Sequence, residues 1–424
     1  MGTVGGGVVE LLGRHADLVA SRTGVRFALR GIADLTPDAG LDVAFDRRLL
    51  TDDAGAVLRD PSVQIVIELI GGTGAARELT LAALAAGKPV VTANKALLAK
   101  HGPELFRAAR AAGVDIFFEA SVAGGLPIIR ALREGLVADR IESIHGILNG
   151  TCNYILTRME AERKPFEEVL AAAQAAGYAE ANPALDVDGH DTAHKAVVLA
   201  ALAFGAPVPL ESVHVRGIRG VSCRDLLLAL GLGRRLKLLA ILRSTPAGLE
   251  ACVEPCLVPE HGLMGSVSDV FNAILVRGDP IGETLYYGRG AGRPSTASAI
   301  VGDLVDAAEL LAGKRTARPD GFTTGAAAPA IVPAGAVESR FYLRVSFASA
   351  AGADESSERA WQALARHHVH PLSVQPVAHA DGSGSALVVQ TRATPARRIE
   401  VAVHELGGLA GVAEAPVWFR IEDL

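Results

Sequence analysis

The run VQIVIELIGGTGAARELTLAALAAGKPVVTANK, residues 63–95, decides the fold of the first part of the chain. Residues 63–70 form a short apolar run typical of a buried strand, and the Ala- and Leu-rich stretch at 75–86 is typical of a helix. A second apolar run follows at 88–94, and a third at 114–120. Strands that alternate with helices at this spacing predict an α/β fold with a parallel, doubly wound sheet.

Ligands of such a sheet bind at the edge where its strands end. These ends carry Gly71–Thr73, Asn94–Lys95 and Glu119. Between the second and third strands, Pro103 predicts the first turn of a helix, because proline is favoured there, and Gly113 predicts its end.

A glycine-rich turn, GTVGGGVVELL at residues 2–12, opens the chain and leads into a helix. Glycines let backbone amides approach a phosphate, and the amino terminus of a helix adds favourable partial charge. The dinucleotide fingerprint places a strand before G-x-G-x-x-G, yet Met1 stands directly before Gly2, and Gly5 is the next glycine. We therefore expect a Rossmann-type sheet whose first strand is missing from this sequence.

The next predicted strand, roughly residues 25–34, ends in Asp34. An acid at this place usually binds the ribose 2′-hydroxyl and favours NAD, whereas an arginine favours NADP. Asp34 favours NAD, and Arg30 keeps NADP open.

The run 171–205 carries the charges with the most chemical content. Asp191 and Lys195 stand four residues apart, so a helix places them on one face. On spacing alone, a solvated surface pair is the commoner explanation. The helix that continues from Lys195, AVVLAALAF, is apolar on every face, however, and a lysine on a buried helix needs a partner. A carboxylate beside an amine can hold a small amino acid and move a proton.

Composition excludes several classes of protein. The net charge of −6 and the absence of a Lys/Arg cluster argue against nucleic-acid binding. No apolar run of 18 residues lacks a charge or helix breaker, so we expect no membrane span, and the start lacks a signal peptide, which favours the cytoplasm. Four cysteines in 424 residues make no disulfide framework, and we interpret Cys252 and Cys256 as reduced thiols.

Several strings resemble the homoserine dehydrogenase family, in the order of that family. They are GTVGGGV (2–8), TANKALLA (92–99), FEASVAGGLPII (118–129), GILNGTCNYILTRM (146–159), AQAAGYAEANPALDVDGHDTAHK (173–195) and GRGAGRPSTASAIVGDL (288–304). The resemblance implies the NAD- or NADP-dependent interconversion of L-homoserine and L-aspartate 4-semialdehyde, on the route to threonine and methionine.

The resemblance also assigns roles to residues. Lys195 is implied as proton donor and acceptor, and Lys95 as its neighbour beside nicotinamide and substrate. Glu180, Asp191 and Asp186 are implied in substrate binding, the first two through its ammonium group. Cofactor-binding positions are Gly2, Thr3, Val4, Gly5, Asp34, Thr73, Asn94, Lys95, Gly177, Gly290 and Gly292. A sodium or potassium ion is implied at Glu119, Val122, Gly124 and Leu126, mostly through backbone oxygens.

The expected organisation has four parts. They are a dinucleotide-binding domain at 1–127, a substrate and dimerisation domain at 128–315, a linker at 316–336 and an ACT-like regulatory domain at 337–424. Within the second part, we expect a helix at 231–242 and another capped by Ser295 or Thr296. The last part predicts the order β-α-β-β-α-β, which resembles an ACT module.

Three questions stay open from the sequence. In the first ACT loop, Ser349 stands where the family has an acid, beside Gly352 and Ala353, so threonine binding there is doubtful. The chain is expected to form a homodimer or homotetramer. Asn149 and Thr151 cap a helix or line the active site, and capping is favoured.

Two rival functions remain. One is a non-catalytic amino-acid sensor of the same architecture, and the other is a dehydrogenase for a related amino alcohol. A metal site at His190 and His194 is a weaker alternative, because no third ligand is evident.

Overall fold

A computed structural model describes residues 2–36, 43–205, 207–322, 329–348, 353–378 and 384–424. The chain divides into two compact units. The first comprises residues 1–150, 190–213 and 270–329, and the second comprises 151–189, 214–269 and 330–424. Among the described residues, no helix is both long and apolar enough to cross a membrane.

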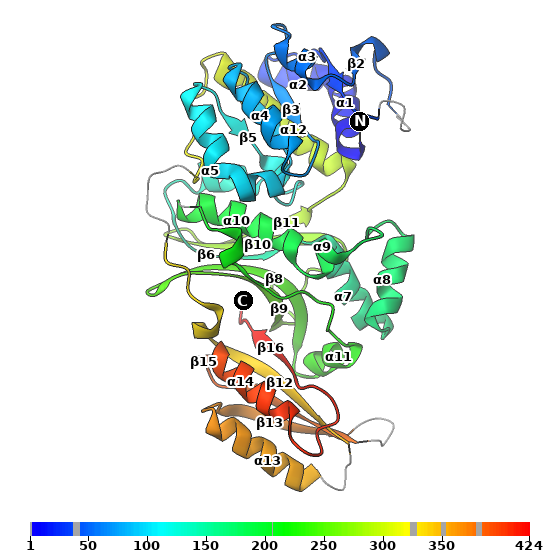
Figure 1. Cartoon of the computed structure of the whole chain (residues 1–424), viewed down its shortest axis with the longest axis vertical. Helices are drawn as coiled ribbons and strands as arrows, with labels where there is room; N and C mark the ends of the chain where they lie inside the picture. The colour runs from blue at the N-terminus through cyan, green and yellow to red at the C-terminus, as the bar shows by residue number, and fades with distance from the viewer. Residues whose placement is uncertain (1, 37–42, 206, 323–328, 349–352, 379–383) are drawn as a thin grey trace. The chain divides into compact units, whose positions relative to one another are not determined.

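The first unit contains the predicted parallel sheet. Its strands are β3 (Val66–Glu68), β4 (Val90–Thr92) and β5 (Ile116–Phe117), and all of them pair in parallel in that order. Helices α4 (Ala75–Ala85) and α5 (Lys95–Ala111) make the connections (Figure 1). The α/β prediction is confirmed for this segment, although each strand is shorter than its apolar run.

Helix α5 begins earlier than predicted. Asn94 accepts the backbone N–H of Leu97 on its side chain, and this cap starts the helix at Lys95. Pro103 therefore lies inside the helix rather than in its first turn. The expectation from Pro103 was wrong because a stronger start signal, the Asn94 cap, stands nine residues before it.

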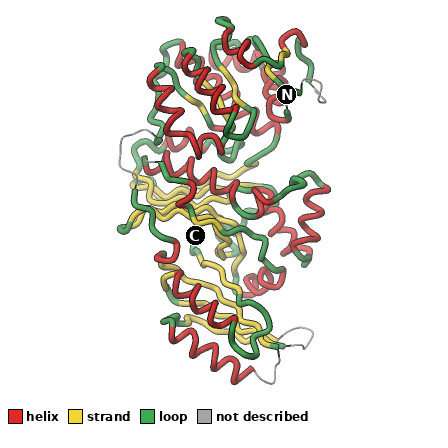
Figure 2. Tube along the Cα trace, viewed as in Figure 1, coloured by secondary structure: helices red, strands yellow, loops and turns green. Residues whose placement is uncertain are grey.

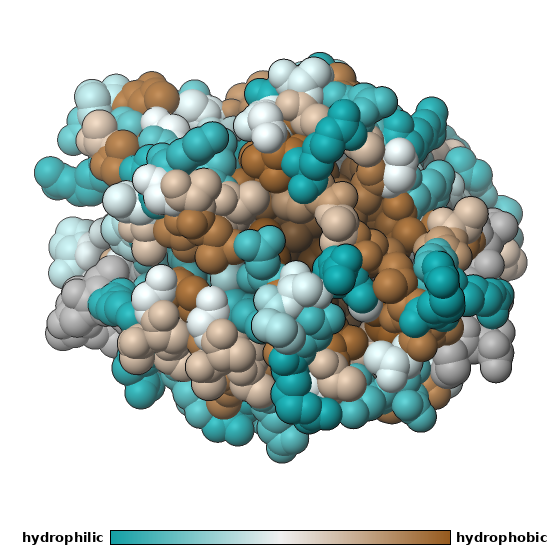
Figure 3. All heavy atoms as spheres, turned by 90° about the horizontal axis from the view of Figure 1, so that it is seen from above, coloured by the Kyte–Doolittle hydropathy of each residue, from teal (hydrophilic) through white to brown (hydrophobic). Residues whose placement is uncertain are grey.

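A separate pair of short parallel strands, β1 (Ile32–Ala33) and β2 (Leu50–Thr51), lies in the same unit. The strand expected at 25–34 shrinks to two residues, because Leu50 and Thr51 are its partners in the ladder. In the described part of the chain, no strand links this pair to β3, β4 and β5. Figure 3 shows hydrophobic side chains around a hollow on one face, with hydrophilic side chains at its rim.

Three helices and a 3-10 turn accompany these strands. They are α1 (Thr3–Arg14), α2 (Ala16–Thr23), α3 (Ala54–Arg59) and Arg47–Leu49. Helix α1 packs against α12 (Arg293–Leu311), and a Cβ atom on Gly7 would lie 2.7 Å from Cγ of Arg293. Glycine therefore permits this close approach. Gly292 stands at the N-cap of α12, where Ser295 donates its hydroxyl to the carbonyl of Gly292, so the predicted side-chain cap was wrong.

The rest of the first unit is built on an antiparallel sheet in the order β11-β10-β6. Its strands are β6 (Arg140–Ile147), β10 (Phe271–Asp279) and β11 (Gly282–Arg289). Helix α10 (His190–Phe204) contacts α5. The short turns of this unit are the 3-10 segments Glu119–Ser121 and Leu210–Ser212, the helix α6 (Ile128–Arg130) and the π-helix Ala131–Gly135.

The second unit holds a mixed sheet in the order β8-β9-β16-β12-β14-β13. Its strands are β8 (Arg234–Thr245), β9 (Gly248–Pro259), β12 (Glu338–Phe347), β13 (Pro371–Ala378), β14 (Ser385–Thr391) and β16 (Val417–Ile421). Two short strands add to it, β7 (His214–Val215) on β9 and β15 (Thr394–Pro395) on β12. The helices are α7 (Gly150–Glu162), α8 (Phe166–Ala175), α9 (Ala184–Val187), α11 (Cys223–Gly231), α13 (Ala353–Arg366), α14 (Ala396–Gly407) and the 3-10 turn Ala334–Ala336.

The helix predicted at 231–242 was wrong. Those residues form most of β8, which pairs with β9 over its whole length, from Arg234 opposite Pro259 to Thr245 opposite Gly248. Leucine and alanine favour helices locally, but this long antiparallel ladder overrides that preference.

The last part of the chain shows the element order β12-α13-β13-β14-β15-α14-β16, and the predicted order β-α-β-β-α-β is therefore interrupted by the two-residue strand β15. Helices α13 and α14 share a core with the sheet, and Figure 2 shows both helices in red beside its yellow strands. The residues at the expected effector loop, 349–352, lie outside the described part, and of Ala353 only the helix start is described. The relation to ACT modules therefore stays a prediction.

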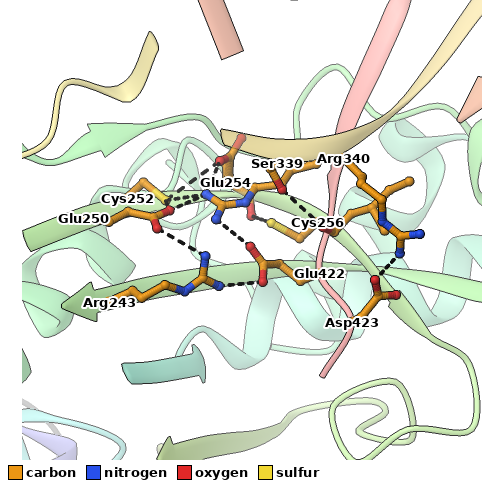
Figure 4. A network of polar contacts seen from close by, with 11 residues as sticks. Arg243, Glu250, Cys252, Glu254, Cys256, Ser339, Arg340, Glu422 and Asp423 are labelled. Carbon is orange, nitrogen blue, oxygen red and sulfur yellow. Dashed lines mark hydrogen bonds and ion pairs between the residues drawn. The ribbon is translucent and has the colours of Figure 1, made fainter. Parts of the chain in front are cut away.

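A network of buried charges ties β16 to β9 (Figure 4). Arg420 of β16 is 2% exposed, and its guanidinium forms ion pairs with Glu250, Glu254 and Glu422. Arg243 bridges two of these acids, at 3.3 Å from Glu250 and 2.7 Å from Glu422. The final strand is thus held by charge as well as by its ladders.

Lys237 of β8 is a second buried charge, and it yields a prediction about pH. Its ammonium donates to Oδ1 of Asn153 at 3.2 Å and to the carbonyl of Val267. Burial lowers the pKa of Lys237 to about 8. Because an unfolded lysine has a pKa of about 10.4, the unfolded chain binds more protons here between those two values. Lys237 therefore opposes folding below pH 8, and this cost disappears as the pH rises through the window.

We expect the native protein to become more stable relative to Lys237→Met as the pH rises from 8 to 10. The difference between their free energies of unfolding should change by roughly 3 kcal/mol at most. Urea unfolding followed by circular dichroism at both pH values measures the difference. The variant shares every other titrating group, so a difference that does not change with pH would contradict the assignment.

Candidate active site

Two helices of the first unit bring the predicted lysines together. Lys95 is the first residue of α5, directly after β4 and the Asn94 cap. Asp191 and Lys195 lie on α10, which contacts α5. The predicted trio therefore comes from the carboxyl end of a parallel strand and from the start of a buried helix.

Asp191 is the centre of this cluster. Its Oδ1 lies 3.0 Å from Nζ of Lys95, and its Oδ2 accepts Nζ of Lys195 at 2.7 Å. Nζ of Lys195 also donates to the backbone carbonyl of Leu148 at 2.7 Å. One carboxylate thus joins two amines that stand a hundred residues apart in sequence.

Burial distinguishes this cluster from a surface pair. The side chains of Asp191, Lys195 and Lys95 are 6%, 12% and 32% exposed, respectively. Burial by itself would raise the pKa of Asp191, but the charges of Lys195 and Lys95 outweigh it and hold that pKa well below its usual range. The carboxylate is therefore ionised at every working pH. The surface-pair alternative is excluded by this burial.

Asn149 belongs to the same cluster. It follows β6, and its Nδ2 donates to Oδ2 of Asp191 at 2.9 Å. The preference for a capping role missed this contact. Thr151, by contrast, donates its hydroxyl to the carbonyl of Tyr178 within the second unit.

The two histidines near Asp191 form no metal site. Among the described residues, no group of three His, Cys, Asp or Glu side chains is placed to hold a metal ion. Burial lowers the pKa of His194, although Asp191 opposes that shift. His194 is consequently a mostly neutral neighbour of the cluster at neutral pH.

Predicted cofactor positions gather at two places in the first unit. Gly2 is the N-cap of α1, with Thr3, Val4 and Gly5 in its first turn, and no side chain of the described residues caps these amides. First-turn amides of this kind suit a phosphate. At the other place, Nδ2 of Asn94 donates to the carbonyl of Gly72 at 2.8 Å and so joins the loops after β3 and β4, next to Thr73.

The remaining predicted cofactor positions of the first unit are Asp34, Gly290 and Gly292. Asp34 follows β1, and its Oδ1 accepts the N–H and hydroxyl of Thr36. Gly290 precedes α12 and packs against Asn272, where a Cβ atom would lie 2.2 Å from Cγ of that side chain. Gly292 is the N-cap of α12.

Three predicted residues lie in the second unit. They are Gly177, Glu180 and Asp186. Glu180 is exposed, and Gln174 donates to its carbonyl at 2.9 Å. Asp186 lies in α9. Their part in a site stays a prediction.

Comparison with known proteins identifies the family. Residues 127–305 match the homoserine dehydrogenase family model, and residues 1–119 match the model for the NAD-binding domain of homoserine dehydrogenase. The homoserine dehydrogenase of Neisseria gonorrhoeae is 39% identical over 427 residues, which cover 100% of this chain and 97% of that protein. The chain belongs to the homoserine dehydrogenase family. It is accordingly an NAD(P)-dependent oxidoreductase that acts on homoserine.

Other homoserine dehydrogenases agree. The protein of Pseudomonas aeruginosa is 40% identical over 436 residues, which cover 100% of this chain and 98% of that one. A crystal structure of the Thiobacillus denitrificans enzyme matches with a TM-score of 0.89 at 40% identity, covering 100% of this chain and 96% of that chain. A hyperthermophilic archaeal homoserine dehydrogenase in complex with NADPH matches with a TM-score of 0.58 at 26% identity, over 72% of this chain and 95% of that one.

The loop at 119–126 is where homoserine dehydrogenases were expected to hold an alkali ion. The carboxylate of Glu119 accepts the N–H groups of Ile129 at 2.9 Å and Arg130 at 2.8 Å, and it therefore satisfies two backbone donors of α6. The carbonyls of Val122 and Gly124 accept no backbone N–H from the described residues. Backbone oxygens of this kind suit a hard cation, and each carboxylate oxygen of Glu119 accepts one N–H group and keeps a second lone pair.

Proposed function

We propose that Lys195 moves the hydroxyl proton during interconversion of L-homoserine and L-aspartate 4-semialdehyde. The observation that carries this proposal is the shared carboxylate of Asp191, which reaches Lys195 at 2.7 Å and Lys95 at 3.0 Å. When bound, NAD or NADP supplies the hydride chemistry at the carbinol carbon. The chain itself must then accept the proton of the hydroxyl group, and return it in the reverse direction.

The charges of the cluster support a lysine in this role. Asp191 carries one negative charge, while two amines reach it. Both amines contact this one carboxylate, Lys195 at 2.7 Å and Lys95 at 3.0 Å. Lys195 is the more buried amine, and Lys95 stays available to stabilise negative charge as it develops on the substrate oxygen.

Substrate binding follows from the remaining acids. The ammonium group of homoserine needs a carboxylate, and Glu180 with Asp191 is proposed to provide it, with Asp186 on the same acidic segment. In the structure both oxygens of Asp191 are engaged, by Lys95, Lys195 and Asn149.

The cofactor is proposed to bind along the carboxyl ends of β3 and β4 and at the start of α1. The uncapped amides of that helix and the Asn94–Gly72 bridge support this position. Asp34 favours NAD, while Arg30 is engaged by the hydroxyl of Ser62 at 3.1 Å. Preference for NAD over NADP is therefore the expected outcome.

Three further properties belong to the proposal. A sodium or potassium ion would be held at Glu119, Val122, Gly124 and Leu126, mostly through backbone oxygens. The protein is proposed to work in the cytoplasm as a homodimer or homotetramer. Threonine regulation through residues 337–424 is not part of the proposal, because Ser349 replaces the acid of the effector loop.

The decisive experiment follows nicotinamide absorbance while homoserine is oxidised, with NAD and NADP in parallel. Each cofactor is tested in sodium, potassium and tetramethylammonium salts at equal ionic strength. We expect turnover with homoserine, faster with NAD, and a loss of rate in tetramethylammonium. Binding of homoserine without turnover would favour the amino-acid sensor, and a better rate with another amino alcohol would favour the second rival.

A further inference from the structure

Lys195 has a fixed set of hydrogen-bond partners. Its Nζ donates to Oδ2 of Asp191 and to the carbonyl of Leu148, each at 2.7 Å. An amine nitrogen has four tetrahedral positions, and Cε occupies one of them. The two acceptors take two more, so a single position remains. It holds a lone pair when Lys195 is neutral and a proton when it is charged.

The direction of that last position depends on where the two acceptors stand. Leu148 is held by the backbone that follows β6, and its side chain is fully buried. Asp191 could rotate about its side-chain bonds, but a second donor restrains it. Nδ2 of Asn149 lies 2.9 Å from the same Oδ2 that receives Lys195. Asn149 is 5% exposed, so solvent does not compete for this contact.

We propose that Asn149 is a positioning residue of the reaction, which fixes the Asp191 carboxylate so that Lys195 presents its remaining position in one direction. Adjacent residues, Leu148 and Asn149, then orient the amine together, one directly and one through Asp191. The inference rests on the proposed role of Lys195 as the group that moves the proton.

One consequence distinguishes a positioning role from a merely structural one. Without the Asn149 amide, Asp191 has one fewer donor and attracts the Lys195 ammonium more strongly. Oxidation requires the neutral amine, so the pH profile of kcat reports a change in this contact. The other charged and titratable groups at the cluster are Lys95 on α5 and His190 and His194 on α10, and they are unchanged by this substitution.

The experiment compares Asn149→Ala and Asn149→Asp with the native protein in pH profiles of kcat and KM for homoserine oxidation. In Asn149→Ala we expect kcat at neutral pH to fall about 10- to 100-fold, as for a misplaced catalytic group, with KM for homoserine changed less than about threefold. The acid limb, which is the fall of kcat at low pH, should move to higher pH. Asn149→Asp has the same shape but adds a negative charge, and it should move the limb further.

Asn153→Ala is the matched control. Asn153 is also a buried asparagine, 2% exposed, but it contacts Lys237 and Val267 in the second unit. Its loss should lower stability and leave the acid limb in place. Circular dichroism and cofactor binding establish that each variant is folded.

The outcomes are distinguishable. An unmoved acid limb in both Asn149 variants, or the same movement in Asn153→Ala, would overturn the positioning role while native turnover persists. If the native protein does not oxidise homoserine, the proposed function itself fails. An acid limb that survives in Lys195→Ala would instead remove the lysine on which the inference rests.

Discussion

Replacement of Lys195 by alanine is expected to reduce kcat for homoserine oxidation by about 100- to 10,000-fold, the usual contribution of a positioned acid–base group. Asp191 keeps Lys95 at 3.0 Å and Asn149 at 2.9 Å, so the carboxylate is not left without partners. Homoserine and the cofactor should therefore still bind. Calorimetric titration of each ligand, together with steady-state rates, measures the two effects separately.

A second variant tests proton transfer rather than charge. Lys195→Arg keeps a positive charge, but a guanidinium does not lose its proton at any accessible pH. We expect it to be nearly as inactive as Lys195→Ala. Lys314→Ala, at an exposed position beyond α12, is the matched control and should keep native rates. Turnover close to native in Lys195→Ala or in Lys195→Arg would exclude Lys195 as the proton carrier.

The parallel part of the fold was predictable because its signals are local. Apolar runs at 63–70, 88–94 and 114–120 lie between breakers, and α4 and α5 connect strands β3, β4 and β5 in the structure. The helix prediction for residues 231–242 was wrong for the opposite reason. Their partners in β9 lie up to 25 residues away in sequence, as Arg234 pairs with Pro259. No local sequence pattern indicates that pairing.

The active-site cluster divides in the same way. The spacing of Asp191 and Lys195 is visible in the sequence, and family resemblance supplied Lys95. The sequence favours a capping role for Asn149, because asparagine directly before a helix usually caps it. Its contact with Asp191 spans 42 residues and depends on how β6 meets α10. The resemblance of its string, GILNGTCNYILTRM, was the only signal that could have placed it in the site.

Replacement of Arg420 by methionine is expected to lower the free energy of unfolding by about 3–5 kcal/mol, because it leaves buried acids without their counter-charge. Glu250, Glu254 and Glu422 are all less than a tenth exposed. Arg243 would still bridge Glu250 and Glu422. The loss of unfolding free energy should therefore be smaller than for three carboxylates buried without any counter-charge.

Tryptophan fluorescence during urea unfolding is the appropriate measurement. Both tryptophans of the chain, Trp361 and Trp418, belong to the second unit, and Trp418 lies on β16 two residues before Arg420. The guanidinium carbon of Arg216 also stands 4.0 Å from the centre of the Trp418 ring, so release of β16 should change its emission. Arg398→Met, on the exposed face of α14, is the control and should stay within about 0.5 kcal/mol of native.

The pH dependence of Arg420→Met distinguishes lost charge from lost packing. Arg243 and Arg216 still contact these acids in the variant, but loss of the Arg420 charge disfavours the ionised carboxylates in the folded state, so the folded variant takes up protons before the unfolded chain does. Its stability relative to the native protein should therefore recover as the pH falls towards 5. A defect of packing would be equally large at both pH values, since methionine fills much of the volume of the arginine stem. A constant deficit would show that Arg420 holds β16 by its bulk, and that the ion pairs in Figure 4 contribute little to its attachment.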